Sequence, residues 1–88
     1  MHYKQSKGIV IRRVDDSVFL VKPETDALFQ LDGPGSVLWL ALADPLDTDE
    51  AIKLLLIAFP DADAQTVARD VDALFKDLKD HHLIEAME

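Results

Sequence analysis

The sequence predicts a small α+β domain in which a three-stranded antiparallel sheet is followed by three helices. Short runs rich in apolar and β-branched residues occupy positions 9–14, 17–22 and 27–31, and turn residues separate them. After Gly35 the apolar residues recur at helical spacing instead. The chain has 88 residues, the length of one domain, so residues 1–88 are expected to fold as one unit with a winged-helix-like shape.

The residues between the three predicted strands are typical of tight turns. Asp15-Asp16 separates the first two strands, and Asp tolerates turn conformations because its side chain bonds its own backbone. Pro23 ends the second strand, since its ring fixes φ. In the third strand, alternation directs residues 27, 29 and 31 to one face and Leu28 and Gln30 to the other. Leu28 is therefore expected on the surface or in a contact site.

Capping residues mark the first two predicted helices. Asp32 is expected to be the N-cap of the first helix, with Pro34 in the first turn, where no backbone donor is needed. Asp47 or Thr48 is expected to cap the second helix, and Glu50 completes the pattern of a capping box. Both helices thus have starts that are encoded locally.

The third helix is predicted to open at the Asp residues of positions 61–63 and to be strongly amphipathic. Beyond it, Leu83-Ile84 is expected to fold back on the body of the domain. The apolar stripe of the helix has spacings of three and four residues and consists of Val67, Val71, Leu74 and Leu78.

The composition excludes several classes of protein. The absence of cysteine excludes disulfides and thiolate metal sites. No apolar run reaches the roughly 20 residues that span a bilayer, so no membrane partner is expected. The first residues lack the apolar core of a signal peptide, which favours a cytoplasmic location. The formal net charge of −8 disfavours nucleic-acid binding, because such a body repels phosphate.

The charge is distributed unevenly along the chain. Four basic residues precede the first acid, Asp15, whereas the rest of the chain holds all 17 acids and five bases. The two parts therefore carry +4 and −12. Either the acids simply keep a small protein soluble, or the basic first strand with Arg12 and Arg13 contacts an acidic peptide or partner.

No residue pattern predicts catalysis or a metal centre. His81-His82 lies at a helix end, where adjacent side chains point in different directions, and Asp77 and Asp80 do not complete a known metal-binding spacing. Residues 33–35 precede a helix but lack the pattern of a phosphate-binding loop. The serines have no spaced His and acid that would activate a nucleophile. We therefore expect no catalytic residue, no metal and no cofactor.

Two segments and the Asp-rich opening of the third helix carry a resemblance to a known family. The segments are Leu20-Val21-Lys22-Pro23-Glu24-Thr25 and Leu31-Asp32-Gly33-Pro34-Gly35-Ser36-Val37-Leu38-Trp39. Over residues 8–85 the chain resembles the coenzyme PQQ synthesis protein D (PqqD) family, also known as the RiPP recognition element. Two departures are Asp32 in place of the usual Asn and His82 in place of a common Gly. His can adopt the left-handed conformation of a helix C-cap, at more cost than Gly.

The resemblance implies a non-catalytic peptide-binding adaptor. Similar domains bind the leader segment of a precursor peptide as an added β-strand at the edge of the third strand, in a groove closed by the third helix. They present the precursor to a separate maturation enzyme, often a radical-SAM enzyme. Backbone pairing provides affinity, and a pocket such as one between Leu28 and Phe75 provides specificity. The expected peptide-binding residues are Ala27, Leu28, Phe29, Gln30, Leu31, Ala68, Val71, Asp72 and Phe75.

Other readings of these elements stay open. A winged-helix DNA-binding module needs a basic recognition helix, but residues 63–80 contain three bases against five acids. The second alternative is a structural module that pairs with itself through the open edge. The expected oligomeric state is therefore a monomer or a weak homodimer. Phe75 packing in the core is the alternative to a contact role. Because Arg12 and Arg13 discourage pairing at the first strand, the uncharged strand 27–31 is the predicted docking edge.

Overall fold

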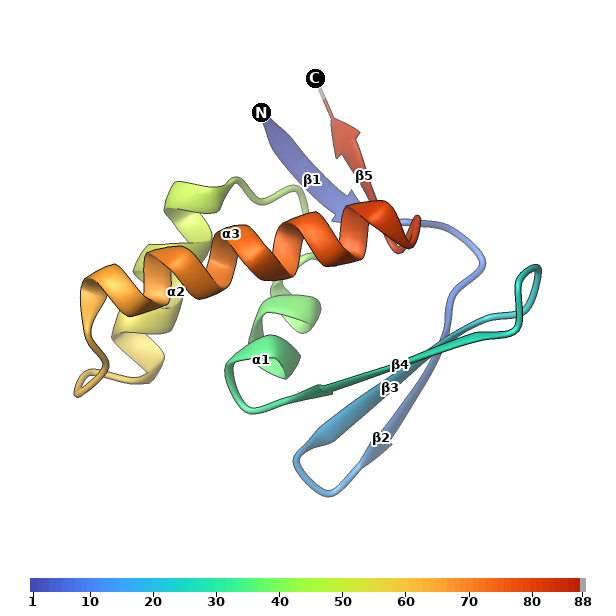
Figure 1. The fold of residues 1–88 in the computed structure, drawn as a ribbon, viewed down its shortest axis with the longest axis horizontal. Coiled ribbons are helices and arrows are strands. Elements are labelled where there is room, and N and C mark those ends of the chain that lie inside the picture. The colour runs from blue at the N-terminus through green and yellow to red at the C-terminus, as the bar shows by residue number, and fades with distance from the viewer. Residues whose placement is uncertain (88) are drawn as a thin grey trace.

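The computed structural model describes residues 1–87 and confirms the predicted α+β class (Figure 1). Strands β2, β3 and β4 form an antiparallel sheet in that order, and β1 pairs with β5 in a separate two-stranded sheet. None of the described helices has the length and apolar character needed to cross a membrane. The elements are β1 (His2–Gln5), β2 (Val10–Val14), β3 (Ser17–Lys22), β4 (Ala27–Asp32), α1 (Pro34–Ala41), α2 (Thr48–Ala58), α3 (Ala64–Asp80) and β5 (Ile84–Met87).

The three-stranded sheet buries one face against the helices. Its central strand contributes Val18 and Leu20, which are almost completely buried, and β4 adds Leu31 opposite Val18. In Figure 1 the helices lie on the side of the sheet where β4 runs. The largest fully buried side chain of the core is Trp39 of α1. Helix α1 packs on β4, and the buried residues of α3 belong to the same core, so this packing determines where β4 lies relative to α3.

The step from β4 to α1 differs from the prediction, because Gly33 and not Asp32 is the N-cap. Asp32 remains in β4 opposite Ser17, and its carboxylate accepts hydrogen bonds from the Ser17 hydroxyl and the Gln30 amide. Gly33 has φ 50° and ψ −120°, a conformation that is essentially restricted to glycine. Pro34 is the first helical residue and so lies in the first turn, as predicted.

The capping box of α2 is confirmed. Asp47 is the N-cap, and its carboxylate accepts a 2.7 Å hydrogen bond from the Glu50 backbone N–H. The Glu50 carboxylate accepts a reciprocal 3.0 Å bond from the Asp47 N–H. These two bonds satisfy donors that the helix itself cannot pair.

Helix α3 is capped at both ends by local interactions. The Asp63 carboxylate accepts a 3.0 Å hydrogen bond from the Thr66 N–H at the start. At the end, His82 has φ 56°, and the Leu83 N–H donates to the Leu78 carbonyl at 2.8 Å. This is the Schellman arrangement, and it confirms the left-handed conformation expected of His82.

The two-stranded sheet of β1 and β5 was not predicted. The two segments pair from His2 opposite Met87 to Gln5 opposite Ile84, and in Figure 1 they lie side by side at the ends of the chain. The other edge of β1 exchanges backbone hydrogen bonds of 2.8 and 2.9 Å with Leu46 through Tyr3. Leu83 and Ile84 are buried, so the predicted fold-back of this apolar pair is confirmed.

Candidate functional site

The hydrogen-bond register shows which backbone groups of the sheet are already used. Val14 and Ser17 close the two-residue turn of the β2–β3 hairpin, so this pair exchanges backbone hydrogen bonds. In an antiparallel ladder such pairs alternate with pairs that bond outward. From Val18 onward, every second residue of β3 therefore directs its backbone groups to β4. Their partners are Leu31, Phe29 and Ala27.

The edge of β4 therefore presents the backbone groups of Leu28 and Gln30. These residues alternate with those that bond to β3, and β3 is the one strand neighbour of β4 within residues 1–87. Their N–H and C=O groups point away from the sheet in its own plane. A free row of this kind is a template on which another extended chain can pair.

A groove runs between this edge and α3. From β4 it is lined by Gln30, Leu31 and Asp32, and the hollow has a volume of about 300 Å³. Gly35 of α1 also lines the groove and adds no side chain to it. A Cβ at this position would stand between the walls, 3.4 Å from the Leu31 side chain and 3.8 Å from that of Leu74. The other residues that line the groove are Pro34, Leu38, Leu55, Asp70, Val71 and Leu74.

The groove continues toward the first turn of α3. A second hollow of about 250 Å³ shares Pro34, Leu55 and Asp70 with the first. Phe59 and Val67 contribute further apolar walls. An extended chain placed along β4 can thus reach an apolar region between α2 and α3 without leaving the surface.

The far end of α3 is held against the sheet. The His81 ring meets the Phe29 ring edge-on, with 5.0 Å between centroids. The Lys22 ammonium of β3 donates a 3.0 Å hydrogen bond to the His82 carbonyl. These two contacts hold the end of α3 next to the sheet. The spacing between α3 and β4 sets the width of the groove.

The structure brings together the predicted strand residues but separates the predicted helix residues. Ala27 and Phe29 are half-buried on the helix side and Leu31 is buried, whereas Leu28 is 65% exposed on the opposite face. Phe75 is only 4% exposed, and its ring packs edge-on against Tyr3 at 5.5 Å between centroids. Leu28 and Phe75 therefore do not share a pocket.

Of the four predicted α3 residues, Val71 lines the groove. Leu74, a member of the predicted apolar stripe, and Asp70, which was not among the expected peptide-binding residues, line it as well. Because an α-helix advances about 100° per residue, Asp70 and Leu74 lie to one side of Val71. Ala68, Asp72 and Phe75 lie to the other side. The helical pattern revealed both flanks, but no local signal shows which one faces β4.

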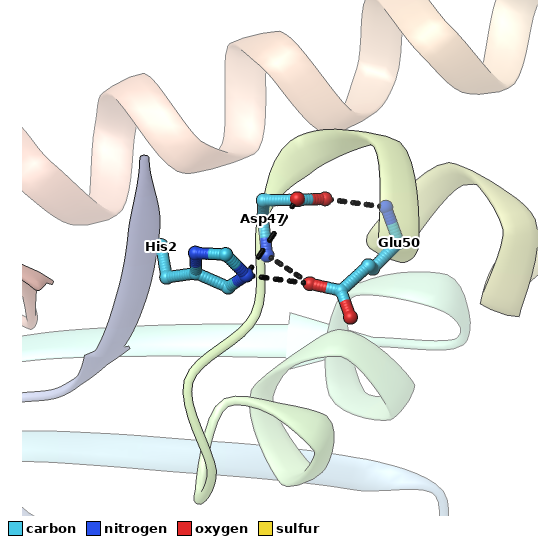
Figure 2. A group of neighbouring side chains, drawn as sticks. All are labelled: His2, Asp47 and Glu50. Carbon is cyan, nitrogen blue, oxygen red and sulfur yellow. Dashed lines mark hydrogen bonds and ion pairs between the residues drawn. The ribbon is translucent and has the colours of Figure 1, made fainter. Parts of the chain in front are cut away.

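A second cluster lies at the first turn of α2. Figure 2 shows His2 of β1 directed at this turn, with its Nε2 atom 3.1 Å from Glu50 and 3.7 Å from Asp47. Among the described residues these three side chains form a group of metal-ligand type. Both carboxylates already serve the capping box, and the positive end of the helix dipole opposes a cation. The cluster is explained by helix capping and by the polar contact of the His2 ring with the two carboxylates, which ties β1 to α2.

Two solved structures share the fold of this chain. A structure of "TbiB1 in Complex with the TbiA(beta) Leader Peptide" is 28% identical, with a TM-score of 0.83 over 97% of this chain and 98% of that chain. A structure of "Lasso peptide synthetase B1 complexed with the leader peptide" shares the fold at 16% identity, with a TM-score of 0.80 over 98% and 100%. No curated protein sequence matches. The family model of coenzyme PQQ synthesis protein D matches residues 17–84, so the chain belongs to this family.

Proposed function

We propose that this protein is a non-catalytic adaptor that binds the leader segment of a ribosomally made precursor peptide by strand addition at β4. The observation that carries the proposal is the open β4 edge beside a groove lined by α3. Both similar structures are complexes with a leader peptide, and one of them is 28% identical over nearly the whole chain. Neither comparison supports the DNA-binding alternative.

In this mode the peptide extends the sheet by one strand. Its backbone pairs with the N–H and C=O groups of Leu28 and Gln30, which provides affinity without a sequence requirement. Every second side chain then enters the groove beside Leu31 and Leu74, and these contacts provide specificity. The bound precursor is presented to a separate maturation enzyme, in the cytoplasm where the precursor is synthesised.

A proline at the edge tests strand addition directly. Gln30→Pro removes an N–H that points away from β3, and proline is tolerated at such edge positions. Gln30→Ala is the matched control, because it deletes the same side chain and keeps the N–H. With the leader peptide of the co-encoded precursor, we expect binding by Gln30→Pro to be about tenfold weaker or more, since a peptide carbonyl loses its partner.

The measurement is isothermal titration of each variant, supported by backbone amide NMR shifts of the wild type. Shifts should appear over 27–32 and over the part of α3 that includes Asp70, Val71 and Leu74. Equal affinity of Gln30→Pro and Gln30→Ala, in variants that remain folded, would show that the peptide does not pair with β4. Shifts confined to other elements would lead to the same conclusion.

A further inference from the structure

Another hollow, of about 400 Å³, lies between the β2–β3 turn and α1 and is here called the α1 hollow. Its helical walls are apolar and consist of Val37 and Leu40 of α1 and Phe59 at the end of α2. Leu40 is 46% exposed, so water reaches this wall. The strand-addition site does not use the α1 hollow. Its other lining residues are Arg13, Asp15, Asp16, Ser17, Val18, Gly33 and Ser36.

The α1 hollow is continuous with the groove beside β4, although the two lie on different sides of α1. Because a helix advances about 100° per residue, the positions that line the α1 hollow (36, 37 and 40) and those that line the groove (34, 35 and 38) fall on different sides. The hollow of about 250 Å³ between α2 and α3 connects them around the start of the helix. Phe59 lines both this hollow and the α1 hollow, and Pro34 of the groove directly follows Gly33 of the α1 hollow.

Resting on the proposed function, we propose that the α1 hollow is a second binding site for the same precursor peptide. It would take an apolar side chain from the segment that leaves β4 at the Asp32 end. There the chain turns directly into α1, so a strand paired with β4 runs out over the start of this helix. In Figure 1 this point and the β2–β3 turn lie at the same end of the sheet, in agreement with the pairing of Ser17 with Asp32.

The start of α1, over which the peptide passes, offers a hydrogen-bond donor. Among the residues that the structure describes, no side chain caps this helix. Pro34 has no N–H, and the Ser36 N–H donates to the Gly33 carbonyl at 3.1 Å. The Gly35 N–H is therefore the first-turn donor that a carbonyl of the crossing peptide can pair.

The shape and charge of the α1 hollow favour an extended peptide over a second copy of the chain. The hollow is concave and opens between two elements, so a single side chain of an extended segment can enter it. Two chains that each carry −8 repel one another. Arg13, Asp15 and Asp16 are exposed and carry both signs of charge, so the apolar wall selects the side chain.

The test changes the apolar wall and shortens the peptide. Leu40→Glu places a carboxylate in the α1 hollow at a position that does not line the groove beside β4. Ile57→Glu on α2 is the matched control, because Ile57 is an apolar helix residue that is 78% exposed and lines neither site. The probes are the leader peptide of the co-encoded precursor and two shortened forms. One form lacks the residues before the segment that pairs with β4, and the other lacks the residues after it.

Isothermal titration should show that Leu40→Glu binds the full leader about fivefold more weakly than the wild type, because an apolar contact is lost. Ile57→Glu should bind it with wild-type affinity. One of the two shortened leaders should also bind the wild type about fivefold more weakly, and it should not distinguish the wild type from Leu40→Glu. Equal affinity of the wild type and Leu40→Glu for the full leader would overturn the proposal.

A nitroxide label on the leader tests the wild type without any substitution. Attached to one end of the leader and then to the other, the label should broaden the amide NMR signals of residues 36–40 from one of the two ends. A complex in which the signals of 27–32 shift, but neither label broadens those of 36–40, would overturn the proposal. Failure of the proposed function is distinguishable, because the signals of 27–32 would then not shift when the leader is added.

Discussion

The two edges of one small sheet differ in almost every property that matters for binding. All five residues of β2 are exposed, and two of them are arginines. In β4 the exposed and covered residues alternate, and a groove with a wall from α3 runs beside the strand. Within residues 1–87 both edges offer unpaired backbone groups. The hollow beside β4 has a wall from α3, whereas the hollow that Arg13 of β2 lines is bounded by the β2–β3 turn and α1. An open edge becomes a specific site when a second element stands beside it.

The largest expected effect comes from placing a charge in the wall of the groove. Leu74→Asp puts a carboxylate where we expect an apolar peptide side chain. Loss of a central apolar contact costs about 2 kcal/mol, so peptide affinity should fall about thirtyfold. The measurement is isothermal titration with the leader peptide.

Ile11→Asp is the control for this experiment, because Ile11 is an exposed apolar residue of the β2 edge. Its peptide affinity should equal that of the wild type. Equal losses of peptide affinity in Leu74→Asp and Ile11→Asp would show that the two edges of the sheet do not differ in peptide binding.

Gly33, at the exit of β4, gives the next largest effect. Gly33→Ala places a Cβ at φ 50° and ψ −120°, although within residues 1–87 nothing beyond its two chain neighbours lies within 4 Å of that Cβ. The cost is therefore one of backbone conformation, about 2 kcal/mol of unfolding free energy. Urea denaturation measures it. A wild-type midpoint would mean that the strand-to-helix step tolerates other conformations, and that Gly33 does not position the β4 edge.

His82→Gly should stabilise the protein. His82 holds a left-handed conformation at the end of α3, where glycine has no Cβ penalty. The expected gain is about 1 kcal/mol, measured by thermal or urea unfolding. Peptide affinity should not change, because the carbonyl that accepts from Lys22 is retained. A loss of stability would show that the His82 side chain contributes more than its backbone strain costs.

The smallest expected effect provides the sharpest comparison of the edges. The alternation that begins at Val14 and Ser17 directs the backbone N–H of Arg13 away from β3, as it does for Gln30 on the other side of the sheet. Arg13→Pro is thus the β2 counterpart of Gln30→Pro. Peptide affinity should stay within about twofold of the wild type. A tenfold loss would move the docking site to β2.

Local chemistry was sufficient to predict most elements of the fold. The capping box of Asp47 and Glu50, the Asp63 cap and the left-handed His82 all depend on residues within a few positions of one another. The β1–β5 pair was not predicted, because each strand has four residues and its partner lies at the opposite end of the chain. Asp32 is an acceptable N-cap by type, but its carboxylate is held by Ser17 across the sheet.

The sequence by itself determined the order of elements, the meander with its uncharged third strand, and the family. Each of these follows from short-range periodicity, turn residues and composition. Only the tertiary structure decided which flank of α3 faces β4. An amphipathic helix carries two flanks beside its buried stripe, and packing against α2, β5 and Tyr3 of β1 selects between them. Phe75 packs in the core against Tyr3, whereas Asp70 and Leu74 line the groove.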